Sequence, residues 1–248
     1  MPHDHAIQCV HDPLLVVLSY LVSVLGSFTA LQLAVGIPRA SGAGRRWPAI
    51  FCAGAAMGGG AIWAMHFIAM LACRMDLQVA YDLRITAASA GIAMASCMVG
   101  LGVASAGVFG WGKLLAGGLF MGLGVTGMHY TGMAAMLMPA TVHYDAALVA
   151  ASMAIAVVAS IAALWLAFNL RGRLQMLGSA LVMGVAVCGM HYTGMLAASF
   201  VAAPARAVPA GLSGAHLGTG IFAVTSLLLA VVLATSLVRQ RQRAAVEI

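Results

Sequence analysis

The chain has 248 residues, of which 63% are hydrophobic and only 7% are charged. A water-soluble domain of this size could not cover its surface with so few charged side chains, so a soluble globular protein is excluded. The formal net charge is +6 at pH 7, but the basic residues are scattered between apolar segments. We therefore expect lipid as the surrounding medium and no nucleic-acid partner.

Seven uncharged stretches are long enough for a membrane-spanning helix, which needs about 20 apolar residues. Several are longer than one span and must include loop residues near Pro139, Pro204 and Pro209. These lengths predict an all-α polytopic membrane protein with seven transmembrane helices. In chain order the stretches are 14–38, 47–73, 85–112, 114–144, 146–170, 174–205 and 207–238.

The basic residues between these stretches are unequally divided between the two sides of the membrane. The positive-inside rule assigns the richer side to the cytoplasm, which puts the N-terminus outside and the C-terminus inside. Most acidic residues then fall on the outer side. The richer side holds Arg39, Arg45, Arg46, Lys113, Arg171, Arg173, Arg239, Arg241 and Arg243, and the poorer side holds Arg74, Arg84 and Arg206.

The sequence contains three copies of one two-helix unit, over about 11–71, 81–136 and 144–200. In each unit an acidic residue opens the first helix, and a glycine-rich second helix carries a central histidine. A seventh helix over about 217–238 completes a transmembrane domain of residues 1–238, and a short basic cytoplasmic tail follows at 239–248. Successive units enter the membrane in the same direction, so they are parallel repeats whose equivalent residues lie at equal depth.

The three second helices share a Met-His motif near their predicted outer ends, reading WAMHFIAM, GMHYTGM and GMHYTGM. A methionine four residues after each histidine lies on the same helix face. Another methionine directly precedes each histidine, about 100° around the helix. The candidate ligands are therefore His66, His129 and His191 with Met70, Met133 and Met195, followed by Met65, Met128 and Met190.

Mixed imidazole and thioether ligands favour copper, because thioethers are soft donors, although zinc and iron remain open. An open position on such a metal would suit dioxygen, nitric oxide or carbon monoxide. Two other interpretations stay open: a structural hydrogen-bonding layer formed by the histidines, and packing of the methionines as core filling. Four outer residues are further candidates, although the aspartates also suit helix capping: Asp12, Asp82, Asp145 and His143.

Two other patterns concern structure. Gly54 with Gly58 and Gly118 with Gly122 have GxxxG spacing, which favours close helix packing in lipid. Cys9 and Cys73 both fall on the predicted outer, oxidising side, where a disulfide between them is an option.

The three motifs, their spacing, the Tyr-Asp helix starts and the helix count resemble the MHYT domain family of bacterial membrane sensor proteins. Two copies match its Met-His-Tyr-Thr pattern fully, whereas the first has Phe67 and Ile68 in place of Tyr and Thr. The resemblance implies a copper-binding sensory module for a diatomic gas, or for redox or copper status, in the inner membrane. It also implies His66, His129 and His191 as ligands.

Relatives of this kind often carry cytoplasmic output domains, and the tail RQRQRAAVEI resembles none. We therefore expect a cytoplasmic or membrane signalling partner in trans, or a longer natural chain. Two other functions stay open: delivery of copper to another membrane protein, and a membrane metal-dependent redox enzyme. No soluble catalytic motif is apparent, so a non-enzymatic role is favoured.

Overall fold

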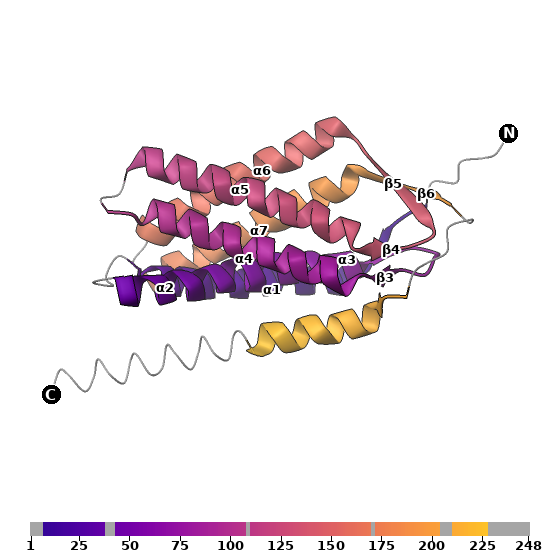
Figure 1. Cartoon of the computed structure of the whole chain (residues 1–248), viewed down its shortest axis with the longest axis horizontal. Helices are drawn as coiled ribbons and strands as arrows, with labels where there is room; N and C mark the ends of the chain where they lie inside the picture. Colours follow the sequence, from indigo (N-terminus) through magenta and orange to yellow (C-terminus); the bar gives the residue numbers. More distant parts are fainter. Residues whose placement is uncertain (1–6, 38–42, 108–109, 170–171, 204–209, 228–248) are drawn as a thin grey trace.

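The computed structural model describes residues 7–37, 43–107, 110–169, 172–203 and 210–227. The described part is mostly helical, and its helices run roughly parallel to the long axis of the molecule (Figure 1). Short strands gather at one end, which we call the β-end. The helices are α1 (Pro13–Ala34), α2 (Ala43–Ala55), η1 (Ala56–Trp63), α3 (Ala64–Ala72), α4 (Leu83–Ala104), α5 (Trp111–Ala134), α6 (Ala146–Asn169) and α7 (Arg173–Leu196).

Among the described residues, five helical segments are long and apolar enough to cross a membrane: Pro13–Ala34, Arg46–Ala72, Leu83–Ala104, Ala146–Asn169 and Arg173–Leu196. Helix α5 has 24 residues, but its glycines and polar motif residues lower its mean hydropathy. A further helix over 214–227 coincides with the start of the predicted seventh span. The rest of that span and the basic tail lie outside the described residues.

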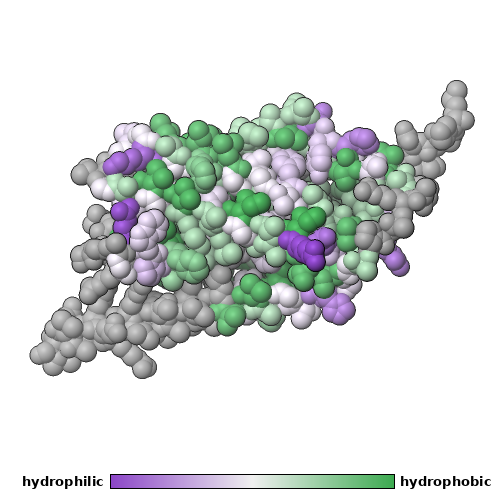
Figure 2. Space-filling model, in the orientation of Figure 1, coloured by the Kyte–Doolittle hydropathy of each residue, from purple (hydrophilic) through white to green (hydrophobic). Residues whose placement is uncertain are grey.

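Large apolar side chains are exposed along the flank of the bundle. Leu14 is 80% exposed, Val158 67% and Leu174 85%. Figure 2 shows hydrophobic residues covering the middle of the molecule and hydrophilic residues near its two ends. An exposed apolar surface of this extent needs lipid around it. The chain is therefore a multi-pass membrane protein.

The spanning helices close into a ring in chain order. Helix α1 packs against η1 and α3 on one side and against α7 on the other. Segment η1 packs against α4, α4 against α5, α5 against α6, and α6 against α7. The close approach expected from the GxxxG pairs is present. A β-carbon added to Gly58 would lie 2.4 Å from the Ala93 carbonyl oxygen of α4, and one added to Gly122 would lie 2.5 Å from Val157 Cα of α6.

The helix of the first repeat contains a π-helical segment, η1, which the regular glycine-rich pattern did not predict. A π-helical turn holds one more residue than an α-helical turn. All eight residues of η1 are buried, and a β-carbon on Gly26 of α1 would lie 2.5 Å from the Ala61 nitrogen. The run Gly58–Gly59–Gly60 lacks the side chains that would oppose this distortion.

Antiparallel strand pairs at the β-end join the two helices of each repeat, an addition to the predicted all-α fold. The strands are β1 (Val10–His11), β2 (Cys73–Arg74), β3 (Ala80–Tyr81), β4 (Met136–Leu137), β5 (Ala140–Tyr144), β6 (Ala198–Ala202) and β7 (Leu212–Ser213). They pair as β1–β2, β3–β4 and β5–β6, and β7 adds to β3. A disulfide joins Cys9 and Cys73 beside the first pair.

Backbone hydrogen bonds at the helix starts follow the same repeat. The N–H of Asp12 donates to the carbonyl of Ala72, the last residue of α3. The N–H groups of Asp82 and Asp145 donate to the carbonyls of Ala135 and Ala197, which directly follow α5 and α7, and the three distances are 2.8 to 2.9 Å. Each repeat is thereby closed at the β-end by one bond between its two helices. Pro139, which lies between β4 and β5, is outside any helix as expected, whereas Pro204 and Pro209 lie outside the described residues.

Candidate metal centre

The structure brings His66, His129 and His191 together inside the bundle. Each side chain is 0% exposed. The Nδ1 atom of His66 lies 3.0 Å from Nδ1 of His191 and 3.3 Å from Nδ1 of His129. The potential ligand atoms of the three residues all lie within 4.8 Å of one another. The parallel repeat predicted equal depth, and helix packing adds convergence on one point.

The three rings are held nearly perpendicular to one another, with centroids 5.0 to 5.2 Å apart and interplanar angles of 75° to 81°. Glycines make room for the outward edges of two rings. A β-carbon on Gly132 would lie 2.3 Å from Nε2 of His66, and one on Gly194 would lie 2.3 Å from Nε2 of His129. The glycine three residues after a histidine thus seats the histidine of the preceding repeat.

The outward nitrogen of each ring is buried without a hydrogen-bond partner among the described residues, at His66 Nε2, His129 Nε2 and His191 Nε2. An unpaired buried donor costs about 1–3 kcal/mol. In each ring, Nδ1 faces the centre, and Nε2 has no neighbouring carbonyl oxygen, within the described part of the chain, to which it can donate. It differs from the usual histidine ligand, whose second nitrogen donates to an oxygen.

Aromatic contacts connect each repeat to the next, and the third connects back to the first. Phe67 packs against Tyr81, Tyr130 against Tyr144, and Tyr192 against His11, with centroids 6.2, 5.4 and 5.5 Å apart. Each pair joins the residue after a motif histidine to the residue before a helix-opening aspartate. The three contacts form a closed cycle of aromatic contacts around the bundle, and His11 takes the place of a tyrosine in this cycle.

A tryptophan replaces the hydroxyl that the first motif lacks. Tyr130 hydrogen-bonds Ser152 of α6 at 2.9 Å. Phe67 cannot do this in the first copy, but Trp63 Nε1 donates to Ser89 of α4 at 3.1 Å. Ser89 and Ser152 each stand seven residues after the aspartate that opens their helix. The departure from the motif in the first copy is thus compensated four residues earlier on the same helix.

The motif methionines are all buried, with exposures between 0% and 7%. Sequence reasoning missed a second set, Met57, Met121 and Met183, which line a small apolar cavity of about 30 Å³ together with Met190. Met121 and Met183 each stand eight residues before a motif histidine, and Met57 stands nine residues before His66, on η1. That recurrent spacing was the available signal.

The other sequence candidates have other partners. The carboxylate of Asp12 accepts from the Leu14 and Leu15 N–H groups and pairs with Arg74. Asp82 and Asp145 likewise cap the helices that they precede. His143 is exposed on β5, where its Nε2 lies 3.4 Å from the Thr141 hydroxyl. These four residues lie outside the histidine cluster.

Two groups at the β-end have shifted pKa values. The hydrogen bond from the Leu15 N–H, assisted by Leu14 and by the Arg74 charge, outweighs partial desolvation and lowers the pKa of Asp12. Burial raises the pKa of Tyr81 to about 12. The Asp12 carboxylate therefore stays ionised and the Tyr81 phenol stays neutral at physiological pH.

The threefold arrangement has a counterpart among known proteins. The family model described as the MHYT bacterial signalling protein N terminal repeat matches residues 59–117, 122–180 and 184–246. Its successive copies start 63 and 62 residues apart, as the three histidines do. The chain belongs to the MHYT family. The resemblance found in the motifs is thereby confirmed.

Relatives of this MHYT chain are bacterial signalling proteins. It is 38% identical over 240 residues to the bifunctional diguanylate cyclase/cyclic di-GMP phosphodiesterase MucR of Pseudomonas aeruginosa, which covers 94% of the chain and 35% of MucR. It is also 38% identical to the cyclic di-GMP phosphodiesterase NbdA of the same organism, over 82% of the chain and 26% of NbdA. The signaling protein YkoW of Bacillus subtilis is 30% identical over 78% of the chain and 25% of its own length.

The MHYT chain thus spans about a third of MucR and about a quarter of NbdA and YkoW. The matched part is a membrane-spanning signalling domain. No solved structure matches the chain.

Proposed function

We propose that this MHYT domain is a copper-binding sensory module that detects a diatomic gas, or redox or copper status, close to the β-end. The observation that carries the proposal is the convergence of three buried imidazole Nδ1 atoms. His66, His129 and His191 would hold the ion. Motif methionines, with Met70, Met133 and Met195 first, are the soft donors available on the same helices.

The spacing of the imidazole nitrogens fits a metal better than it fits a hydrogen-bonded layer. Metal–imidazole bonds of about 2.0–2.1 Å place two nitrogens on one ion about 3.3–3.6 Å apart. The Nδ1 separations of 3.0 and 3.3 Å approach that spacing. Without an ion, His66 Nδ1 faces two other Nδ1 atoms, and one proton cannot satisfy both contacts.

The charge environment favours a monovalent ion. In the part of the chain that the structure describes, the cluster consists of three histidines without a carboxylate. A divalent cation in such a buried, neutral site would lose much hydration without a compensating negative charge. Imidazole and thioether donors both suit Cu(I). Three imidazoles also hold zinc in known sites, so the thioethers of the motif methionines are the donors that favour copper over zinc.

Bound copper with an open position would supply the binding of O₂, NO or CO. The residues of the chain supply the apolar surroundings. The cavity lined by Met57, Met121, Met183 and Met190 is large enough for about one water-sized molecule and is mostly apolar. It would admit a small uncharged molecule and exclude hydrated ions.

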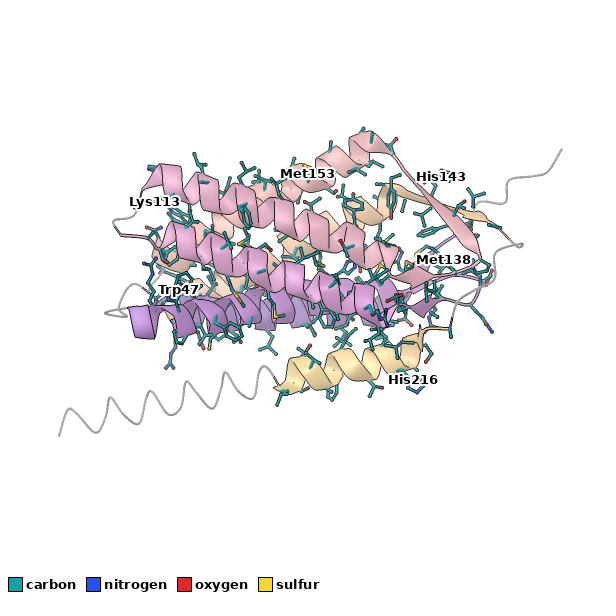
Figure 3. All side chains as sticks on the ribbon, viewed as in Figure 1. Trp47, Lys113, Met138, His143, Met153 and His216 are labelled. Carbon is teal, nitrogen blue, oxygen red and sulfur yellow. A yellow bond between two sulfur atoms is a disulfide. The ribbon has the colours of Figure 1, made fainter. Side chains whose placement is uncertain are left out.

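We further propose that the complete domain has seven spans, with the N-terminus outside and the C-terminus in the cytoplasm of a bacterium, across the inner membrane. The distribution of Arg and Lys supports this orientation. Lys113 and Trp47 lie at the end opposite His143 and Met138 (Figure 3). The signal would then pass from the β-end outside to a cyclic di-GMP output inside, by analogy with what the names of MucR and NbdA describe.

The test is the copper content of the purified protein after expression with added copper. We expect about one copper ion at the histidines, lost in the H66A/H129A/H191A variant. His143→Ala is the matched control, because that histidine is exposed and outside the cluster. Full copper retention by the triple variant would refute the assignment.

The sensory role needs a cellular test. Cyclic di-GMP in the native bacterium should change between aerobic and anaerobic growth, and H66A/H129A/H191A should abolish the change. A deletion that instead impairs a copper enzyme, with rescue by added copper, would contradict sensing and favour copper delivery.

A further inference from the structure

Three methionines, different from the set around the small apolar cavity, line a pocket at the β-end. The pocket has a volume of about 280 Å³ and is lined by Met133, Met136, Met138 and Tyr144. The remaining lining residues are small or apolar: Ala134, Leu137, Ala140 and Val142. Figure 3 places Met138 at this end of the bundle, next to the strands.

Local structure explains why these three methionines meet. Met133 belongs to the last turn of α5, which ends at Ala134. Met136 begins strand β4, and Met138, two residues after Met136, directly follows that strand. Side chains two residues apart in an extended chain point to the same face. The helix end and the extended segment after it therefore present three thioethers to one pocket.

Packing alone does not account for this cluster. Methionine usually fills irregular gaps in a core. These three are less than 10% exposed, and yet a pocket remains between them. A pocket at the equivalent place of the third repeat is lined by Met195, Ala198 and Phe200, so the extra methionines are particular to this pocket and are not needed to form its walls.

We propose that the pocket is a second metal site, specific for Cu(I), with Met133, Met136 and Met138 as its thioether ligands. Thioethers are soft donors that bind Cu(I) and discriminate against harder cations such as zinc and magnesium. Burial raises the pKa of Tyr144, so its neutral phenol adds no charge. Three neutral sulfur ligands suit a monovalent ion.

The site deepens the proposed copper-binding function, because Met133 links it to the histidines. Met133 stands four residues after His129, on the same face of α5. The pocket lies at the strand end of that helix, so an ion arriving from the β-end would meet it before the buried histidines. Its binding is nevertheless a property of Met136 and Met138, which are outside the motif, and can be measured separately.

The experiment titrates the whole purified chain anaerobically with Cu(I) in competition with a colorimetric Cu(I) chelator. X-ray absorption of the loaded protein reports sulfur neighbours of copper. The variant is M136L/M138L, which keeps side-chain volume and leaves Met133 in place. Met153→Leu is the matched control, since Met153 is a partly exposed methionine on the flank of α6 (Figure 3). The single variants M136L and M138L serve if the double variant does not fold.

We expect M136L/M138L to bind one Cu(I) fewer than the wild type, or to bind it at least tenfold more weakly, and to show fewer sulfur neighbours per copper ion. M153L should match the wild type, and H66A/H129A/H191A should keep the sulfur-bound ion. Wild-type stoichiometry, affinity and sulfur scattering in M136L/M138L would overturn the pocket assignment while leaving the histidine centre intact. Conversely, a wild-type ion that depends on Met136 and Met138 but not on the histidines would support the pocket and refute the histidine centre.

Discussion

Replacing Gly132 by alanine should disrupt the histidine centre from a neighbouring helix. The added β-carbon would lie 2.3 Å from Nε2 of His66, whereas an ordinary contact needs about 3.5 Å. The ring must therefore move by about 1 Å. His66 is fully buried and touches Phe67, His129 and His191, so the displacement cannot be absorbed by rotation into open space.

That displacement is large compared with what a metal site tolerates, because ligand distances vary by only about 0.2 Å. We expect copper affinity to fall by about 10–100-fold, as when supporting groups of other metal sites are removed. Overpacking should also cost about 1–3 kcal/mol of unfolding free energy. Copper content after dialysis and thermal unfolding in detergent measure the two effects.

Gly127→Ala is the matched control, because it lies on the same helix and a β-carbon there meets nothing within 4 Å. It should keep wild-type copper content and stability. Equal copper affinity and equal unfolding temperature in Gly132→Ala and Gly127→Ala would refute a steric conflict with His66.

Three further predictions concern structure around the site. Trp63→Phe removes the donor to Ser89 and should destabilise the protein by about 1 kcal/mol, measured as a lower unfolding temperature, whereas an unchanged temperature would contradict a role for this bond. The Cys9–Cys73 disulfide joins residues 64 positions apart, and its reduction should lower the free energy of unfolding by at most about 4 kcal/mol. Thiol labelling before and after reduction verifies the disulfide. The unfolding temperature of the C9S control should not respond to reductant. Because the folded-state pKa of Asp12 is lowered, its contribution to stability is present above the ordinary aspartate pKa and is lost as pH falls through the folded value. Acid titration of unfolding should therefore show a smaller loss in Asp12→Asn than in the wild type, and identical profiles would disprove the linkage.

The recurrence of His66, His129 and His191 in the sequence predicted their equal depth but could not predict their convergence. Equal depth follows from the parallel repeat, whereas convergence depends on how each helix is rotated about its axis. That rotation is set by close contacts such as Gly58 against α4 and Gly122 against α6. The GxxxG spacing indicated these glycines, but the sequence does not identify the helices that they contact.

Two structural features escaped sequence reasoning for a common reason. Residues 198–202 form strand β6, although they continue the apolar stretch of α7, and hydropathy does not distinguish a short buried strand from a helix end. The π-helical segment η1 likewise reads as an ordinary glycine-rich helix. The strands and η1 are consequences of tertiary packing, as is the substitution of Trp63 for the missing tyrosine.

The closed cycle of aromatic contacts limits how many repeats such a protein can contain. Each of its three contacts joins one repeat to the next, and the pair Tyr192–His11 returns to the start. In an open solenoid, units can be added or deleted because each contacts only its neighbours. Here a fourth unit would have to break the Tyr192–His11 contact, and two units would leave it unmade. Three repeats therefore complete this architecture, and it can change by point substitution within the existing units but not by adding or deleting a unit.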